Sequence, residues 1–441
     1  MQKPLIAVLL ASAFSLNAQA ADLIQVYQQA LANDATFASA RAAAAAGRER
    51  ITQGRSGLLP TVGVTGDITK NNSDFTSWNN NPAAGAGSNL RDKTIQVTLQ
   101  QPLFRWDRWE TYQQSKLQQA ISEAQFAQAQ QDLITRVSQA YFDVLAAQDT
   151  LESTRAQKVA VTEQLASAKR NFEVGTQTIT DTHEAQAAYD LVVSQEIAAV
   201  NDLETKKTAL QAIIGTPPAA LATLRTGVTL TAPQPINVDQ WVSAAENQNY
   251  AVTVAQLQLE SAKRDISRNR AGHYPTVDLV ASSLHRDVNG QTVQSGKTNN
   301  NAIGIQYSIP IFNGFAVTSK VRESIALEDK ARNDLEANRR NAALVARQSF
   351  LGVNSGLAQV KALEAAEVSS NSALESNKLG YQVGVRINID VLNAQRQLYQ
   401  TRTDLARARY NTILAGLKLK AAAGSLREED LQPINALLQQ P

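Results

Sequence analysis

Cysteine is absent from the 441 residues of this chain. Without a thiol the protein can form no disulfide framework, no thiolate metal site and no cysteine nucleophile. It also lacks the lipid-modified N-terminal cysteine that anchors some exported proteins. Aromatic residues are few, at 5%, while alanine and glutamine are abundant. This composition favours long, closely packed helices over a compact globule.

Long apolar runs are also scarce. The N-terminus has one at residues 6–16, between Lys3 and the small-residue pattern Ala18-Gln19-Ala20. Such an arrangement is typical of a secretory signal peptide, so residues 1–20 are predicted to be removed. No later segment has the roughly 20 apolar residues that a membrane-spanning helix needs. The exported chain is therefore expected in the periplasm, outside the cell, or in the outer membrane as β-strands.

Charge of neither sign dominates. The 42 basic and 40 acidic residues give a net charge of +2 and are interleaved along the chain. Interleaved charge is typical of solvated helix faces and not of a nucleic-acid-binding surface. Nucleic acid is therefore not expected as a partner.

Residues that carry catalysis are missing or badly spaced. The three histidines share no helical metal spacing. His183-Glu184 begins like a zinc protease motif, but Ala187 occupies the position of the second histidine. No glycine loop precedes a phosphate-binding lysine, and Ser56 is not in a nucleophile elbow. We predict no catalytic residue, no metal site and no cofactor, and therefore no enzyme.

An internal duplication organises what is present. Val174-Gly175 followed by Asp181 recurs 209 residues later as Val383-Gly384 followed by Asp390. Leu210–Gly215 recurs at the same offset as Leu419–Gly424. A Pro-Thr-Val motif at residues 60–62 recurs at 275–277. Fixed-offset matches in order indicate two copies of one structural unit.

Each copy contains two segments with a period of two, which is typical of strands with one apolar and one polar face. They predict β-hairpins at residues 61–101 and 276–310, although residues 277–284 alternate more weakly. Strands of about nine or ten residues suit a tilted bilayer crossing. The edge of a soluble sandwich is the alternative. Two hairpins alone make a poor sheet, so they are expected to pair with other copies.

The remaining sequence is helical. Residues 107–171 and 315–378 contain no proline and few glycines. Ile134, Val137, Tyr141 and Val144 recur at helical spacing, and the second copy repeats the pattern from Phe350. A helix of this length would be about 100 Å long. A rod with a narrow apolar stripe is a coiled-coil element that needs neighbours.

Paired helix breaks are the most informative local features. Gly175 and Gly384 fall where a helix would end, because glycine tolerates a left-handed cap. Asp181 and Asp390 follow six residues later, at the predicted start of the next helix. Each carboxylate there would be stabilised by the helix dipole and could cap the helix. A second interpretation, compatible with the first, is that both turns form the tip of a rod where the acids line an aperture.

These turns carry a resemblance to a known family. Residues 380–386 (GYQVGVR) with 389–395 (IDVLNAQ) resemble the inner-tip motif of TolC-type outer-membrane channels, as do residues 171–175 and 179–181 of the first copy. The resemblance extends from about residue 22 to about residue 432. It implies an α+β membrane protein, in which three chains form a twelve-stranded transmembrane β-barrel with four strands per chain. A long α-helical coiled-coil barrel continues it into the periplasm.

The same resemblance implies a gate. In such channels an arginine and a tyrosine of the second tip turn bond to the first tip turn and hold the entrance shut. In this sequence the roles fall to Arg386 and Tyr381, with Thr180 and Asp181 as acceptors. A further hypothesis, based on histidine titration near periplasmic pH, is that His183 makes opening acid-sensitive.

The family's constricting acidic ring maps onto Asp390 and onto the residue three positions later. That residue is Asn393 here, which departs from the family pattern. Three chains would then contribute three carboxylates instead of six. We therefore expect the aperture to capture cations less strongly than a fully acidic ring does.

The domain organisation expected from the repeat and the resemblance has five parts. The segments between and after the two repeats are interpreted as an equatorial belt around the helices. The parts are a signal peptide at 1–20; repeat 1 at 21–220, with hairpin 61–101 and tip turn 172–181; a linker at 221–240; repeat 2 at 241–424, with hairpin 276–310 and tip turn 380–390; and a tail at 425–441.

The function implied is an outer-membrane exit duct of a tripartite efflux or type I secretion system, which passively conducts drugs or unfolded proteins. The implied partners are two further copies, a periplasmic adaptor, an inner-membrane ABC or proton-driven pump, and outer-membrane lipid. One alternative is a non-channel periplasmic coiled-coil adaptor that bridges the two membranes. Another is an enzyme formed by residues 216–240 with the C-terminal tail.

Overall fold

The structure is a computed structural model that describes residues 20–73, 88–225, 227–290 and 295–439. The predicted signal peptide, residues 1–20, lies outside the described residues except for Ala20. Large parts of both loops that connect the predicted strands, at 74–87 and 291–294, also lie outside them.

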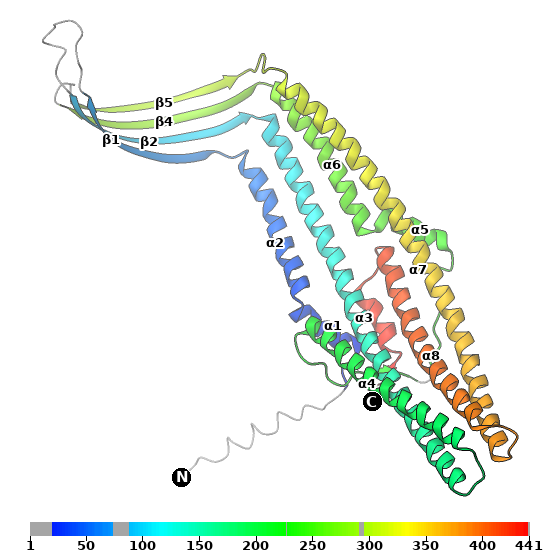
Figure 1. Cartoon of the computed structure of the whole chain (residues 1–441). Helices are drawn as coiled ribbons and strands as arrows, with labels where there is room; N and C mark the ends of the chain where they lie inside the picture. Colours follow the sequence, from blue (N-terminus) through cyan, green and yellow to red (C-terminus); the bar gives the residue numbers. More distant parts are fainter. Residues whose placement is uncertain (1–19, 74–87, 226, 291–294, 440–441) are drawn as a thin grey trace, which may run out of the picture. The chain divides into compact units, whose positions relative to one another are not determined.

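Helices and strands follow the same order twice along the chain, which confirms the duplication (Figure 1). The first series is α1 Leu23–Asn33, α2 Ala35–Ser56, β1 Thr61–Ser73, β2 Ser88–Phe104, α3 Trp106–Glu173 and α4 Ile179–Ile214. The second is α5 Val238–Gln248, α6 Tyr250–Arg270, β4 Thr276–Gly290, β5 Gly296–Ser308, α7 Ala316–Gln382 and α8 Asn388–Ala422. Shorter elements lie between or after them: β3 Thr223–Leu224, η1 Ala271–His273, η2 Glu428–Asp430, α9 Leu431–Asn435 and β6 Leu438–Gln439.

The two long helices match the proline-free segments closely. Helix α3 has 68 residues and α7 has 67, so each is about 100 Å long. The stripe predicted on α3 is buried, since Ile134, Val137, Tyr141 and Val144 are each at most 2% exposed. Among the described residues, no helix is both long enough and apolar enough to span a membrane.

Two compact units make up the chain, and each combines segments of both copies. The first unit comprises the described residues up to 42 together with 124–253 and 337–441. The second comprises 43–123 and 254–336. Helices α3 and α7 therefore each contribute to both units.

A core of α1, α3, α4 and α8 side chains holds the first unit together. Phe142 of α3 stacks on Tyr410 of α8, with ring centroids 5.5 Å apart. The Tyr141 hydroxyl donates to the carbonyl of Ala222, 2.7 Å away, in the segment after α4. That segment also reaches the C-terminal tail, because β3 pairs with β6. The linker and the tail thus pack together on the helical core.

The second unit contains an antiparallel sheet of four strands in the order β1-β2-β4-β5. Both predicted hairpins are confirmed, and β2 pairs with β4 from Leu90↔Gly290 onward, which joins them. The two hairpins of one chain thus form one sheet, and the expectation that this sheet pairs with other copies stays a prediction. The strands have 13 to 17 residues, more than the nine or ten expected. Backbone pairing continues past the end of the apolar alternation into polar residues such as Asn71 and Asn72.

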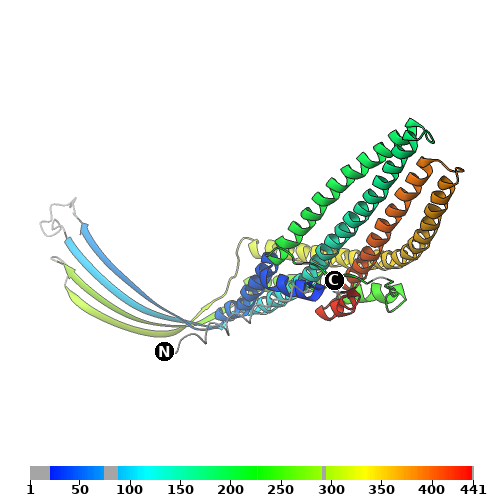
Figure 2. The ribbon, with the colours of Figure 1, turned by 90° about the horizontal axis from the view of Figure 1, so that it is seen from below.

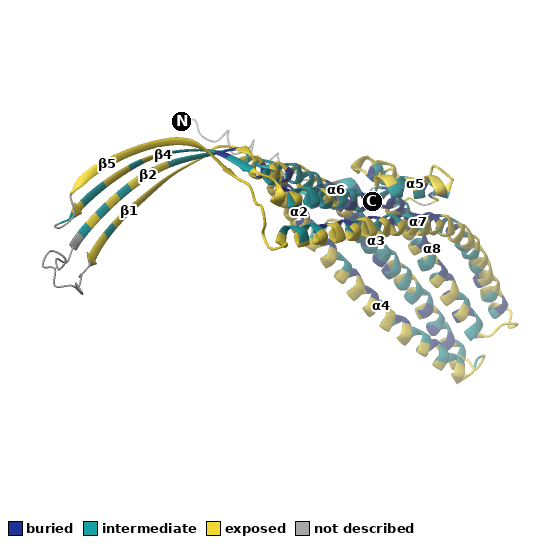
Figure 3. Ribbon diagram, turned by 90° about the horizontal axis from the view of Figure 1, so that it is seen from above, coloured by how far each residue is buried: buried dark blue, intermediate teal, exposed yellow. Residues whose placement is uncertain are grey.

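The two faces of this sheet differ in polarity. The registers place Val62, Leu99, Ala281 and Ile303 in one row on the first face, which we call the apolar face. The opposite, polar face carries mainly Thr, Gln, Gly and Asn side chains from β1, β2 and β5. Exposed and half-buried residues alternate along β2 (Figure 3). Strand β4 alternates weakly, as expected, because it also places apolar side chains on the polar face.

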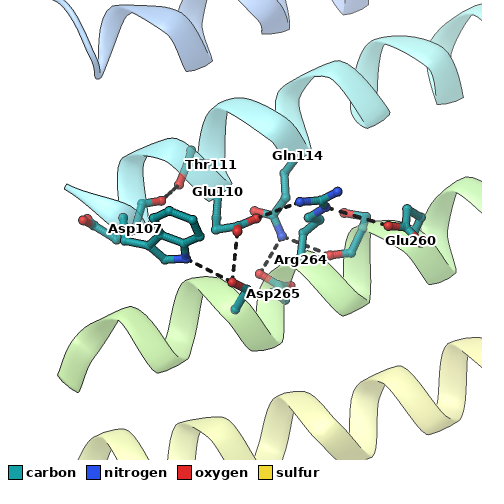
Figure 4. Close-up of polar contacts among 10 residues, drawn as sticks. Asp107, Glu110, Thr111, Gln114, Glu260, Arg264 and Asp265 are labelled. Atoms are coloured by element: carbon teal, nitrogen blue, oxygen red, sulfur yellow. Dashed lines mark hydrogen bonds and ion pairs between the residues drawn. The ribbon is translucent and has the colours of Figure 1, made fainter. Parts of the chain in front are cut away.

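Polar contacts join the start of α3 to α6, within the second unit (Figure 4). Glu110 is only 3% exposed and accepts a hydrogen bond of 2.9 Å from Ser267. The Trp106 indole donates to the same hydroxyl, 3.1 Å away. The Gln114 amide donates to Asp265, 2.9 Å away. These bonds connect the first helix after β2 with the helix that leads into β4.

Candidate functional site

The candidate site lies where α3 turns into α4 and α7 turns into α8, all within the first unit. Figure 2 shows these two helical hairpins side by side, with both turns at the same end. Below the turns, Leu392 of α8 packs into an apolar cluster with Val161 and Leu165 of α3 and Ala185 of α4. The hairpins therefore contact each other through side chains that the helical period places on their facing sides.

Both turns have the same backbone geometry. Gly175 has a φ of 76° and Gly384 a φ of 78°, the left-handed conformation that glycine adopts without strain. The Thr176 amide donates to the carbonyl of Asn171, and the Val385 amide donates to that of Gly380, each over 2.9 Å. These are the backbone bonds of a Schellman motif. The prediction that a glycine ends each helix is confirmed.

The helix starts that follow the turns differ. Thr178 caps α4, because its hydroxyl accepts a 3.4 Å bond from the Asp181 amide. The Asp181 carboxylate in turn accepts from the Thr178 amide, 3.1 Å away, which completes a capping box. The equivalent position before α8 is Ile387, whose side chain cannot cap the helix. Asp390 is therefore at the same position as Asp181 but takes no part in a capping box.

The Asp390 carboxylate faces a cation. Arg386 approaches it to 3.6 Å, and the two side chains are 58% and 33% exposed, respectively. The Arg386 stem lies against Gly380, where a Cβ would come within 2.7 Å of the arginine Cγ. Asn393 follows one turn along α8 and is exposed. Asp390 and Asn393 thus share a helix face next to the turn.

Tyr381 connects the two turns. Its hydroxyl accepts a hydrogen bond of 2.5 Å from the amide of Gln177, in the first turn. The sequence resemblance had placed Thr180 and Asp181 as the acceptors for Tyr381 and Arg386. Within one chain, the partners are instead Gln177 for Tyr381 and Asp390 for Arg386.

Thr180 and His183 lie on exposed positions of α4. Neither makes a side-chain hydrogen bond to the second turn in the described part of the chain. The roles of Thr180 and Asp181 as acceptors for a neighbouring chain, and of His183 as an acid sensor, stay predictions. In the same described part, no group of three or more His, Asp and Glu side chains could hold a metal ion.

Asn388 is a functional candidate that the sequence analysis missed. It is completely buried at the start of α8 and accepts a hydrogen bond of 2.6 Å from the Gln164 amide of α3. Its own amide donates to the carbonyl of Asp181, 3.0 Å away. One side chain thus joins three helices. The repeat could have pointed to Asn388, because the equivalent residue of the first copy is Ile179, an exposed apolar residue, and the two copies therefore differ in polarity at this position.

Comparison with known proteins identifies the family. The model of the outer membrane efflux protein family matches residues 26–216 and 241–425. The chain belongs to this family. The two matched stretches of the family model correspond to the two copies of the duplication and leave out the linker between them.

Relatives cover nearly the whole chain. The outer membrane protein TolC of Escherichia coli (strain K12) is 34% identical over 99% of this chain and 89% of its own length. The Vibrio cholerae TolC protein is 33% identical over 95% of this chain and 94% of its own length. The proteases secretion protein PrtF of Dickeya chrysanthemi is 30% identical, with coverage of 98% and 95%.

Solved structures of more distant sequences share the fold. The Campylobacter jejuni CmeC outer membrane channel superposes with a TM-score of 0.79 at 17% identity, over 95% of this chain and 90% of CmeC. The Vibrio cholerae outer membrane protein VceC gives 0.77 at 19% identity, over 92% and 96%. As a member of the outer membrane efflux protein family, the protein is located in the outer membrane. It serves there as an exit channel for efflux or type I secretion.

Proposed function

We propose that three copies of this chain form one duct whose periplasmic entrance is closed by the tips of α3/α4 and α7/α8. The sheet supports a shared structure, because β1 and β5 are its two edges and have 13 residues each. Edge strands of equal length can pair between neighbouring chains and so remove the exposed edges. Three sheets of four strands close into one sheet of twelve.

The difference between the two tip turns carries the gate assignment. In the first turn Asp181 is committed to a capping box, whereas in the second Asp390 is free of capping and faces Arg386. Threefold symmetry places three copies of Asp390 around one axis. The ring of Asp390, with Asn393 one turn away, attracts cations at the aperture. Tyr381 and Arg386 hold the turns in the closed position.

The proposed partners follow from the closed entrance. A periplasmic adaptor and an inner-membrane pump, of the ABC or proton-driven type, open the tips and supply the cargo. Exposed apolar side chains surround the turns, with Val174 at 73%, Val385 at 75% and Ile387 at 61% exposure. Such side chains offer a contact surface for a partner. A partner that binds the open state more tightly than the closed state shifts the population toward opening.

Conduction through planar bilayers tests this proposal. Purified protein should behave as a trimer in detergent and should insert as a cation-selective channel of low conductance. A monomeric protein that never conducts would contradict the proposal.

The cargo is proposed to be drugs or unfolded proteins, because the pump selects what enters a passive duct. A deletion strain should then be tested for drug sensitivity and for loss of secreted proteins. Loss of one phenotype but not the other assigns the duct to efflux or to secretion, whereas two unchanged phenotypes would contradict a role in either.

The adaptor alternative is not favoured, since the full-length relatives are outer membrane proteins and secretion proteins. The family and the relatives are channel proteins and not enzymes, and the proposed mechanism requires no catalytic residue. Cell fractionation distinguishes a channel from a periplasmic adaptor. A channel stays with the outer membrane as a detergent-stable trimer, whereas a scaffold is released in soluble form.

A further inference from the structure

We propose that the sheet binds a phosphate-bearing anionic lipid through a band of four cations at the loop ends of its strands. The band consists of Lys70, Arg91, Lys93 and Lys297, and we call it the cationic band. This inference rests on the proposed function, because it assumes that the strands cross the membrane with their apolar face toward lipid.

The registers place the whole cationic band on the apolar face. Lys93 pairs with Ile68 on one side and with Asp287 on the other, and Asp287 pairs with Lys297. These four residues form one row across the sheet. The next row toward the loops contains the pair Lys70↔Arg91. Residues directly opposite each other in a sheet point to the same face, so four cations share that face with a single carboxylate.

The opposite face shows that this placement is not a general feature of the sheet. The strands contain one other cation, Arg286, and it lies on the polar face. Arg286 pairs with Asp92 of the neighbouring strand, with two Nε–carboxylate distances of 2.9 and 3.0 Å. The members of the cationic band are exposed, and within the described residues none of them forms an ion pair. Among the described residues, the cation on the polar face is therefore paired with a carboxylate, whereas the cations on the apolar face form no ion pair.

The position of the band along the strands matches a membrane interface. From Val277, opposite the exposed Tyr307, to Asp287 the strand β4 advances ten residues, or about 33 Å. A strand tilted as in membrane sheets spans about 25 Å of height over that length, which is the height of the apolar zone of such proteins. Val64, Ile95 and Ile303 lie in this interval and are 68%, 53% and 77% exposed. On β1 and β2 the cationic band thus begins directly after the last apolar side chain of this face, whereas on β5 Asn301 and Asn299 separate Ile303 from Lys297.

An amphiphile fits this boundary better than a soluble anion does. Acyl chains would lie along the exposed Val and Ile side chains, and a phosphate would reach the cations just beyond them. Arginine can bind a phosphate through two parallel hydrogen bonds, and lysine contributes a compact charge. Asp287 offsets only one of the four charges. We therefore commit to the anionic lipid of the leaflet that surrounds the loop ends of the strands.

Native mass spectrometry of the detergent-purified trimer tests the assignment. Phosphatidylglycerol and phosphatidylcholine with the same acyl chains serve as the anionic and zwitterionic probes. The variant is Lys93→Gln with Lys297→Gln, and the charge-matched control is Lys169→Gln with Lys361→Gln, both on exposed helix positions. Each cation near an anionic headgroup strengthens binding about fivefold, so the variant's preference for phosphatidylglycerol should fall about thirtyfold. The control pair should leave that preference unchanged.

Three further measurements separate the outcomes. Lys93→Arg with Lys297→Arg should keep the preference for phosphatidylglycerol, because the charge is retained. An unchanged preference in the glutamine variant overturns the lipid site. Displacement of the bound lipid by inorganic phosphate at equal concentration also overturns it, because the band would then bind any anion. Channel conductance is recorded from the same preparations. If the unmodified protein does not conduct, the proposed function fails. If it conducts but shows no preference for phosphatidylglycerol, only this inference fails.

Discussion

Single residues determine how the two tip turns differ. Asp181 and Asp390 are equivalent in the repeat, yet one side chain is held in a capping box and the other faces Arg386 across 3.6 Å. The cause lies three residues earlier, where the first copy has Thr178 and the second has Ile387. A hydroxyl can cap a helix and an aliphatic side chain cannot. The difference at this one position therefore leaves the Asp390 carboxylate outside a capping box, where it can face Arg386.

Neutralising each aspartate should produce different effects. Asp390→Asn should lower cation selectivity in planar bilayers and weaken block by multivalent cations, because the charge at the aperture is removed. Asp181→Asn should leave selectivity unchanged and instead destabilise the start of α4 by about 0.3–1 kcal/mol, because it removes a negative charge that the helix dipole stabilises. Hydrogen exchange at the tips measures the second effect. Equal selectivity in the parent and in Asp390→Asn would mean that the aperture lies elsewhere.

The contacts of Tyr381 and Arg386 should hold the entrance closed. Arg386→Ala combined with Tyr381→Phe should raise single-channel conductance. The hydrogen bond from Gln177 to Tyr381 joins the two turns and is worth about 0.5–1.5 kcal/mol. The predicted ion pair of Arg386 with Asp181 of a neighbouring chain is worth about 0–1 kcal/mol, and three chains add their contributions. Arg396→Ala, an exposed arginine ten residues further along α8, is the control and should leave conductance as it is. Unchanged conductance in the double variant would remove the gate assignment.

Whole elements are connected by a few buried polar groups. The hairpin α7/α8 is joined to α3/α4 by Asn388, which bonds to Gln164 and to the Asp181 carbonyl. Burial makes such a link sensitive to change, because a buried group that loses its partner also loses the water that would have solvated it. This link can therefore determine how firmly the two hairpins stay together at the tip.

Exchanging the residues of the two copies tests this link. Asn388→Ile introduces the side chain that the first copy has and should destabilise the tip by about 1–3 kcal/mol, since the Gln164 amide and the Asp181 carbonyl lose their partner. The reverse change, Ile179→Asn, is at a 46% exposed position and should alter stability by less than about 0.5 kcal/mol. Urea denaturation of the detergent-solubilised protein measures both. Equal effects at the two positions would refute a linking role for Asn388.

At the scale of the whole molecule, a buried and a half-buried carboxyl group of the first unit, Asp34 and Asp149, make its stability depend on pH. Burial by itself would raise the pKa of Asp34. The carboxylate, however, accepts two hydrogen bonds of 3.0 Å from Arg136 and one from the Phe37 backbone, and together they lower its pKa. Asp149 differs, because burial raises its pKa despite the hydrogen bond from Tyr410. The two carboxyl groups therefore affect stability in opposite directions.

The direction of each effect on stability depends on whether the folded or the unfolded state binds the proton more tightly. Asp34 stabilises the fold above its unfolded pKa of about 4, and this stabilisation is lost as the pH falls through the folded pKa. Asp34→Asn should lower the urea midpoint at neutral pH and flatten its decline in acid. Asp149 is more acidic in the unfolded chain, so its ionisation costs stability as the pH rises through its folded pKa. Asp149→Asn should raise the midpoint at neutral pH, and a lowered midpoint there would contradict this assignment.

The duplication, the strand pairs, the rods and the glycine turns were all predictable from the sequence. Each depends on residues close together in the chain. A period of two or 3.6 and a glycine at a helix end act over a few residues, and the fixed offset between the copies repeats them. The ends of α3 and α7 accordingly fall within a few residues of the predicted ends.

Tertiary structure decided which of these elements contact each other and through which residues. The pairing of β2 with β4, the buried position of Asn388 and the choice of Gln177 as the partner of Tyr381 depend on residues roughly 200 positions apart. The location of the whole cationic band on the apolar face likewise follows from the register across strands. The sequence by itself determined the two unlike tip turns with which α4 and α8 begin. Only packing between the copies decided that Tyr381 bonds to Gln177 and that Asn388 joins the two hairpins, because these contacts unite residues far apart in the chain.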